Sequence, residues 1–157
     1  MKKIFKIFKL IGIVGAAAIG IISYKKKNEE VKKEKDQWLK MTSYYMLFNK
    51  WMKLKEEGRN TEDYFIKNNI HNIAIYGYKE LGERLYSELK NTPIEVKYII
   101  DKNIDKVRAE IDVYSPDEEL PEVDAIIVTA THFYDEIEDE LSDLVECQII
   151  SLADVII

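Results

Sequence analysis

Short apolar runs alternate with amphipathic stretches along the second half of the chain. The runs are rich in β-branched residues and predict buried strands at Ile73–Tyr76, Val96–Ile100, Ala125–Val128 and Gln148–Ile150, with a weaker strand at Ile111–Tyr114. Between them, apolar residues recur at helical spacing: Leu81, Leu85 and Leu89, then Ile137, Leu141 and Leu144. Continuous apolar strands separated by amphipathic helices are typical of a parallel sheet that is covered on both faces. Right-handed connections make 3-2-1-4-5 the expected strand order.

The turn after the first of these strands has the residues of a nucleotide-binding βαβ unit. Gly77 permits a sharp turn into the following helix, and Gly82 permits that helix to approach the strand closely. Asp101 ends the next strand, where a carboxylate accepts hydrogen bonds from a ribose. Lys79 occupies the place of the second glycine in the dinucleotide motif. Its side chain either obstructs a dinucleotide or supplies a cation to a phosphate at the helix N-terminus.

Ligands of such sheets bind beyond the carboxyl ends of the strands, at the point where the strand order reverses. The residues predicted to contact a ligand there are Gly77, Tyr78, Lys79, Gly82, Asp101, Thr129, Thr131 and His132. Two of them have simpler interpretations: Thr131 as the cap of the helix that begins near Phe133, and His132 as a solvent-facing loop residue. The acidic run from Asp135 to Asp143 is spaced like the exposed face of a helix, and no metal-ligand pattern is recognised.

The first 26 residues predict a membrane anchor. The segment from Ile4 to Tyr24 is long enough to cross a hydrocarbon core if Lys6 and Lys9 reach the interface. A cleaved signal peptide is the competing interpretation, but the apolar run continues past the small residues and lysines follow at once. The excess of lysine on the downstream side predicts a membrane-anchored protein whose globular domain is cytoplasmic.

Residues 27–59 predict a helical connector between this anchor and the domain at residues 60–157. Strong helix formers dominate up to Glu57. Within the connector the apolar residues Trp38, Met41, Tyr45, Phe48 and Met52 take helical spacing, with Leu47, Trp51 and Leu54 beside them. The stripe either receives a partner or a membrane surface, or packs on the sheet. We expect it to pack on the sheet.

Charge and cysteine content narrow the class of partner. Residues 1–35 carry a balance of +7 and residues 36–157 a balance of −13, which together give the net charge of −6. An acidic body disfavours nucleic acid as its partner, because phosphate binding needs basic residues on the docking face. The single Cys147 cannot form an intramolecular disulfide and is interpreted as a buried small apolar residue.

The strand, turn and helix residues Ile73–Gly77 and Leu81–Leu85, followed by Val96–Asp101, resemble Rossmann-like domains of bacterial polysaccharide gene clusters. These domains are labelled nucleoside-diphosphate-sugar epimerase-like, and the N-terminal domain of sialic-acid and bacillosamine-type sugar O-acyltransferases is similar. The resemblance covers about residues 60–157. It implies a nucleotide or nucleotide-sugar over Gly77, Gly82 and Asp101, and it transfers no catalytic residue. Tyr98 and Lys102 have the Tyr-x-x-x-Lys spacing of sugar epimerases, but they lie along a predicted strand rather than on a helix.

Three functions therefore remain open. The first is a membrane-tethered Rossmann-like module that binds a nucleotide or nucleotide-sugar and assists a glycosyltransferase or another enzyme of cell-surface polysaccharide synthesis. The second is a small NAD(P)-dependent epimerase or oxidoreductase that acts as a homodimer, although no acid–base pair is recognised. The third is a scaffold with a degenerate nucleotide fold. The sequence favours the first and leaves the catalytic residues and the cofactor unassigned.

Overall fold

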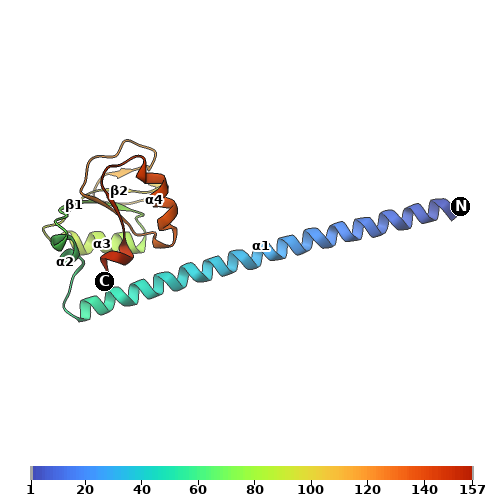
Figure 1. Cartoon of the computed structure of the whole chain (residues 1–157), viewed down its shortest axis with the longest axis horizontal. Coiled ribbons are helices and arrows are strands. Elements are labelled where there is room, and N and C mark those ends of the chain that lie inside the picture. The colour runs from blue at the N-terminus through green and yellow to red at the C-terminus, as the bar shows by residue number, and fades with distance from the viewer. Residues whose placement is uncertain (1, 157) are drawn as a thin grey trace. The chain divides into compact units, whose positions relative to one another are not determined.

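The computed structural model describes the backbone of residues 2–156 and the side chains of residues 22–156. The chain divides into two units, residues 1–42 and residues 43–157, and the second contains the sheet (Figure 1). The elements are α1 (Lys2–Glu56), α2 (Thr61–Lys67), β1 (Asn72–Tyr76), α3 (Glu80–Leu89), β2 (Glu95–Ile100), η1 (Ile104–Lys106), β3 (Val113–Tyr114), β4 (Ala125–Val128), η2 (Thr131–Phe133), α4 (Tyr134–Ser142), β5 (Gln148–Ser151) and α5 (Leu152–Val155).

The five strands form one parallel sheet in the order β3-β2-β1-β4-β5, which is the expected order. In the register of the two central strands, Ile73 pairs with Ala125 and Tyr76 with Val128. β3 has only two residues and pairs with the end of β2. The reversal of strand order therefore lies between β1 and β4, whose carboxyl ends stand side by side.

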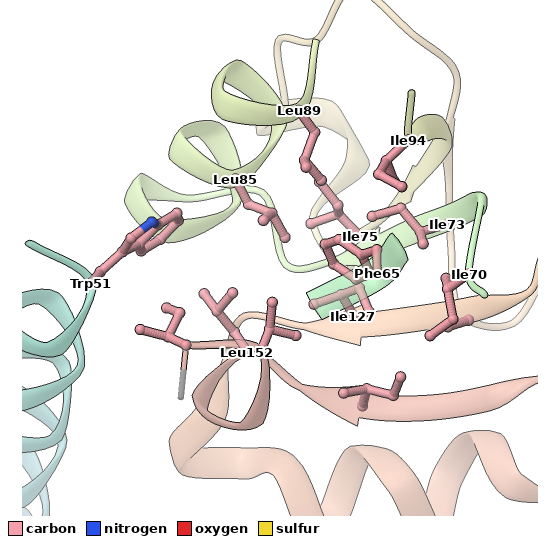
Figure 2. Packing of buried hydrophobic residues seen from close by; sticks show 14 of the residues in the cluster. Trp51, Phe65, Ile70, Ile73, Ile75, Leu85, Leu89, Ile94, Ile127 and Leu152 are labelled. Carbon is pink, nitrogen blue, oxygen red and sulfur yellow. The ribbon is translucent and has the colours of Figure 1, made fainter. Parts of the chain in front are cut away.

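Successive residues of the central strands enter two separate cores, because side chains alternate between the faces of a sheet. Ile73, Ile75 and Ile127 pack with α2, α3, α5 and the last turns of α1 (Figure 2). Tyr76 and Val128 pack on the other face, with α4. Strands buried on both sides need apolar residues at every position, and this need explains the uninterrupted apolar runs.

The last turns of α1 belong to the second unit, and a different stripe from the expected one is buried there. Leu47, Trp51 and Leu54 are in the core, and Figure 2 shows Trp51 directed toward α3. The five residues of the predicted stripe are all exposed. They are Trp38, Met41, Tyr45, Phe48 and Met52. The two stripes lie on different faces of the helix, and both have helical spacing, so periodicity alone could not choose between them.

The membrane anchor predicted over residues 4–24 is corrected by the structure. In the part of the chain that the structure describes, no helix combines the length and the apolar character needed to cross a bilayer. Most of the predicted anchor falls on residues 1–21, whose side chains lie outside that description. Beyond Tyr24, α1 carries charged residues on each turn as far as Asp36, whereas a crossing takes about 20 predominantly apolar residues. The predicted transmembrane helix, and the membrane-anchored location derived from it, are therefore not supported.

Glu88 of α3 joins three helices at one carboxylate. It accepts hydrogen bonds from Trp51 Nε1 at 2.9 Å and from the amide and hydroxyl of Thr61 at 2.8 Å each, and Lys55 Nζ lies at 2.7 Å. Burial by itself would raise the pKa of Glu88, but the bonds from Lys55, Thr61 and Trp51 outweigh it and hold the pKa below its ordinary value of 4.5. This carboxylate therefore ties the ends of α1 and α2 to α3.

Replacement of Trp51 by alanine should lower the free energy of unfolding by about 3–5 kcal/mol, because it leaves a cavity and removes a bond to Glu88. Trp38→Ala is the matched control on the same helix, since 65% of the Trp38 side chain is exposed. It should stay within about 0.5 kcal/mol of the original protein. Urea unfolding of the full chain measures both. Equal losses in the two variants would contradict the assignment of the packing face.

Glu88→Gln should cost about 1–3 kcal/mol at neutral pH, the range for hydrogen bonds to a charged group. Because the folded-state pKa is lowered, the ionised carboxylate contributes its full stability above about pH 4.5 and loses it as the pH falls through the folded-state pKa. The difference between the two proteins should therefore shrink on acidification. Urea midpoints measured between pH 7 and pH 3 test this, with Glu122→Gln, at an exposed position outside the helices, as the control. A difference that is independent of pH would refute the role of the charge.

Candidate functional site

The turn between β1 and α3 is built by two glycines in close contact. Gly77 has φ +88°, a conformation that favours glycine. A Cβ on Gly82 would lie 2.2 Å from the Gly77 carbonyl oxygen, so α3 reaches this position only because residue 82 has no side chain. The N-terminus of α3 is thereby placed at the carboxyl edge of the sheet, directly after β1. Both glycines have the roles that the sequence predicts for the turn.

Asp101 holds this turn against the end of β2. One carboxylate oxygen accepts the amide of Tyr78 at 3.0 Å, and the other accepts the amide of Asn103 at 2.8 Å. The Gly77 amide donates to the Ile100 carbonyl at 2.8 Å in the same corner. The sequence predicted a ribose contact for Asp101. Its oxygens retain further lone pairs for a ligand, but the carboxylate also has a structural task that the pattern alone did not indicate.

Thr129 holds the turn from the side of β4. It is buried, and its hydroxyl lies 2.7 Å from the Gly77 carbonyl and 3.1 Å from the Tyr76 carbonyl. Its amide also donates to the Tyr76 carbonyl at 3.0 Å. The hydroxyl hydrogen is thus used inside the protein. The structure brings Gly77, Tyr78, Asp101 and Thr129 together around one turn.

Two other predicted contacts lie in a short 3-10 helix that follows Thr129 closely in the chain. Thr131 and His132 belong to η2, which precedes α4, and His132 is exposed with its ring against Phe133 at 5.1 Å. The expected capping role of Thr131 is wrong: the N-cap of α4 is Phe133, without a side-chain hydrogen bond. A turn of 3-10 helix displaces the start of α4 from Thr131.

Lys79 is the exposed basic residue of the β1–α3 turn. It is the N-cap of α3, its backbone is extended, and its carbonyl accepts the amide of Glu83 at 2.8 Å. The first turn of α3 also carries two acidic residues, Glu80 and Glu83. These carboxylates offset the positive end of the helix dipole, so Lys79 is needed for this corner to attract an anion.

Sequence reasoning missed a second group of polar residues at the same edge. Tyr76, the last residue of β1, is buried on the face of α4, where Lys102 and Glu140 form an ion pair at 2.7 Å. Within the described residues, no cluster of three or more histidine, cysteine, aspartate or glutamate side chains could hold a metal ion. Cys147, interpreted from the sequence as a buried residue, is only partly buried, and this burial raises the pKa of its thiol.

A comparison with known families matches this part of the chain. The family model described as "C2185-like, N-terminal" matches residues 69–150, just over half of the chain, and the match includes residues of all five strands. No curated protein and no solved structure matches the chain.

Gly82→Ala should destabilise the protein by about 3 kcal/mol, at the upper end of the usual range for overpacking, because the Cβ would meet a backbone carbonyl that cannot rotate away. Ser87→Ala, at an exposed position of the same helix, is the control and should have little effect. Thermal unfolding of the full chain measures both variants. An unchanged midpoint for Gly82→Ala would show that α3 does not contact the Gly77 carbonyl.

Proposed function

This chain belongs to the C2185-like N-terminal domain family, and we propose that its domain binds a nucleotide or a nucleotide-sugar at the carboxyl edge of the sheet. The observation that carries the proposal is the contact of Gly82 with the Gly77 carbonyl. It places the start of a ten-residue helix at the reversal point between β1 and β4, where ligands of open α/β sheets bind. The first amides of a helix have no partner within the helix and are available to a phosphate.

Lys79 is the residue that we expect to contact the phosphate. It is exposed at the start of α3, and a cation there compensates for the neighbouring Glu80 and Glu83. A side chain at this position keeps the pyrophosphate farther from the backbone than a glycine would. Asp101 supports the proposal as a ribose acceptor with free lone pairs beside the same turn.

Two tyrosine–lysine pairs have the spacing of an epimerase pair, and the internal contacts of both favour binding without independent catalysis. Lys90 of the pair Tyr86 and Lys90 forms an ion pair with Glu110. The other pair is Tyr98 and Lys102. The Tyr98 hydroxyl donates to the Pro121 carbonyl at 2.6 Å, and burial raises its pKa to about 12. Lys102 pairs with Glu140. A buried tyrosine with this pKa and an internal partner is a poor proton donor or acceptor at neutral pH.

The resemblance to domains of polysaccharide gene clusters supports a nucleotide-sugar as the ligand and a glycan enzyme as the partner. In this proposal the module binds the activated sugar and the partner performs the transfer. The activity of the assembly then depends on both proteins.

The test is a thermal-shift titration of the full chain with UDP, UDP-glucose, ADP and NAD. A ligand at about 100 times its dissociation constant adds about 2.7 kcal/mol, which raises the midpoint by several degrees. Lys79→Ala should weaken binding of the active nucleotide about tenfold, the loss of roughly one charge-assisted hydrogen bond. Lys97→Ala, at the exposed start of β2, is the matched control for charge.

Asp101 is unsuitable for this test, because its replacement would also release the Tyr78 amide and loosen the turn. Absence of a shift with all four ligands would reject nucleotide binding and leave the scaffold hypothesis. Equal weakening by Lys79→Ala and Lys97→Ala would place the ligand elsewhere.

A further inference from the structure

The hydroxyl of Tyr76 is a buried polar group without a partner. The residue is 4% exposed, and its hydroxyl is the sole buried side-chain polar atom lacking a hydrogen bond among residues 22–156. Two other tyrosines on the same face are satisfied: Tyr98 bonds the Pro121 carbonyl, and Tyr134 bonds the Ile149 carbonyl at 2.8 Å. A phenylalanine at position 76 would fill the same space without an unpaired hydroxyl. The presence of tyrosine therefore calls for an explanation.

Charged groups from two segments of the chain act on this hydroxyl. Lys102 follows β2 and Glu140 lies on α4, and both, together with Asp101, influence the pKa of Tyr76. Burial is the largest effect and raises that pKa, so the hydroxyl remains a hydrogen-bond donor. Lys102 lies close enough to the hydroxyl to lower the pKa of Tyr76. The hydroxyl nevertheless has no partner within hydrogen-bonding distance, because Lys102 Nζ bonds a Glu140 oxygen at 2.7 Å.

The Lys102–Glu140 pair can be opened at little cost. Its side chains are 56% and 34% exposed, and ion pairs as exposed as this contribute little to stability. A ligand that replaced Glu140 would gain the Lys102 cation and the unpaired Tyr76 donor together. With Asp101 and Glu140 both nearby, a group with one negative charge is favoured over a doubly charged phosphate. The Glu140 side chain already shows that a carboxylate fits beside Lys102.

We propose that Tyr76 and Lys102 form a subsite for a carboxylate of the ligand, and that Glu140 occupies this subsite when the ligand is absent. This subsite proposal depends on the proposed nucleotide-binding function only for the nucleotide part of the ligand. The ligand class that it names is a nucleotide-sugar whose sugar carries a carboxylate. Glu140 acts as an internal competitor, so its loss should strengthen binding, whereas loss of Tyr76 or Lys102 should weaken it.

The test compares UDP-glucuronate with UDP-glucose by calorimetric titration of the full chain, since the two differ by a carboxylate in place of a hydroxymethyl group. The original protein should bind UDP-glucuronate about tenfold more tightly. Tyr76→Phe and Lys102→Ala should remove that preference without changing the affinity for UDP-glucose. Glu140→Gln should increase it severalfold, and the control Lys97→Ala should leave it unchanged. Tyr76→Phe should melt no lower than the original protein, because the hydroxyl has no internal partner.

Equal affinities for the two sugars, or a preference that survives Tyr76→Phe and Lys102→Ala, would overturn the proposal. If neither nucleotide binds, the nucleotide function has failed, and the subsite is then tested by adding free glucuronate to ¹⁵N-labelled protein. Chemical-shift changes at Asp101 and Lys102 that Lys102→Ala abolishes would support the subsite. Their absence would overturn it.

Discussion

The close approach of α3 to the Gly77 carbonyl is the constraint on which the carboxyl edge of the sheet depends. A helix that follows a strand this directly must pass over the strand's last carbonyls, and here the space is too small for a single methyl group at residue 82. The turn that results is fastened on both sides. Asp101 bonds it from β2 and Thr129 bonds it from β4. The position of the α3 N-terminus therefore follows from these contacts rather than from the helix itself.

The polar groups at this edge fall into two sets. Asp101 and Thr129 form hydrogen bonds that hold the turn in place. In the proposed function these two residues preorganise the site even where they do not contact the ligand. Lys79 is exposed, and Tyr76 is buried without a partner. The second set lies on two sides of β1, because α3 covers one face of the sheet and α4 covers the other. A ligand that crossed the edge at the reversal point would reach both.

The fold could be predicted from the sequence because strands that are buried on both faces of a sheet appear as continuous apolar runs. The continuous apolar strands and the two glycines identified the sheet, its order and the sharp turn. The packing face of α1 could not be chosen in the same way, because the stripes through Trp38 and through Trp51 have similar spacing. The predicted membrane helix was wrong because it was inferred from the composition of one segment, and the described helices lack the required apolar length. The structural task of Asp101 and the unpaired Tyr76 hydroxyl depend on contacts between distant residues, which a single sequence does not record.

The most direct measurement of the central claim is an amide NMR titration of the full chain with UDP and with ADP. The account predicts that the largest chemical-shift changes occur at the β1–α3 turn and the first turn of α3, from Gly77 to Gly82, and at Asp101. Changes confined to the opposite edge of the sheet, or to the acidic surface of α4, would contradict it. So would unchanged spectra with both nucleotides.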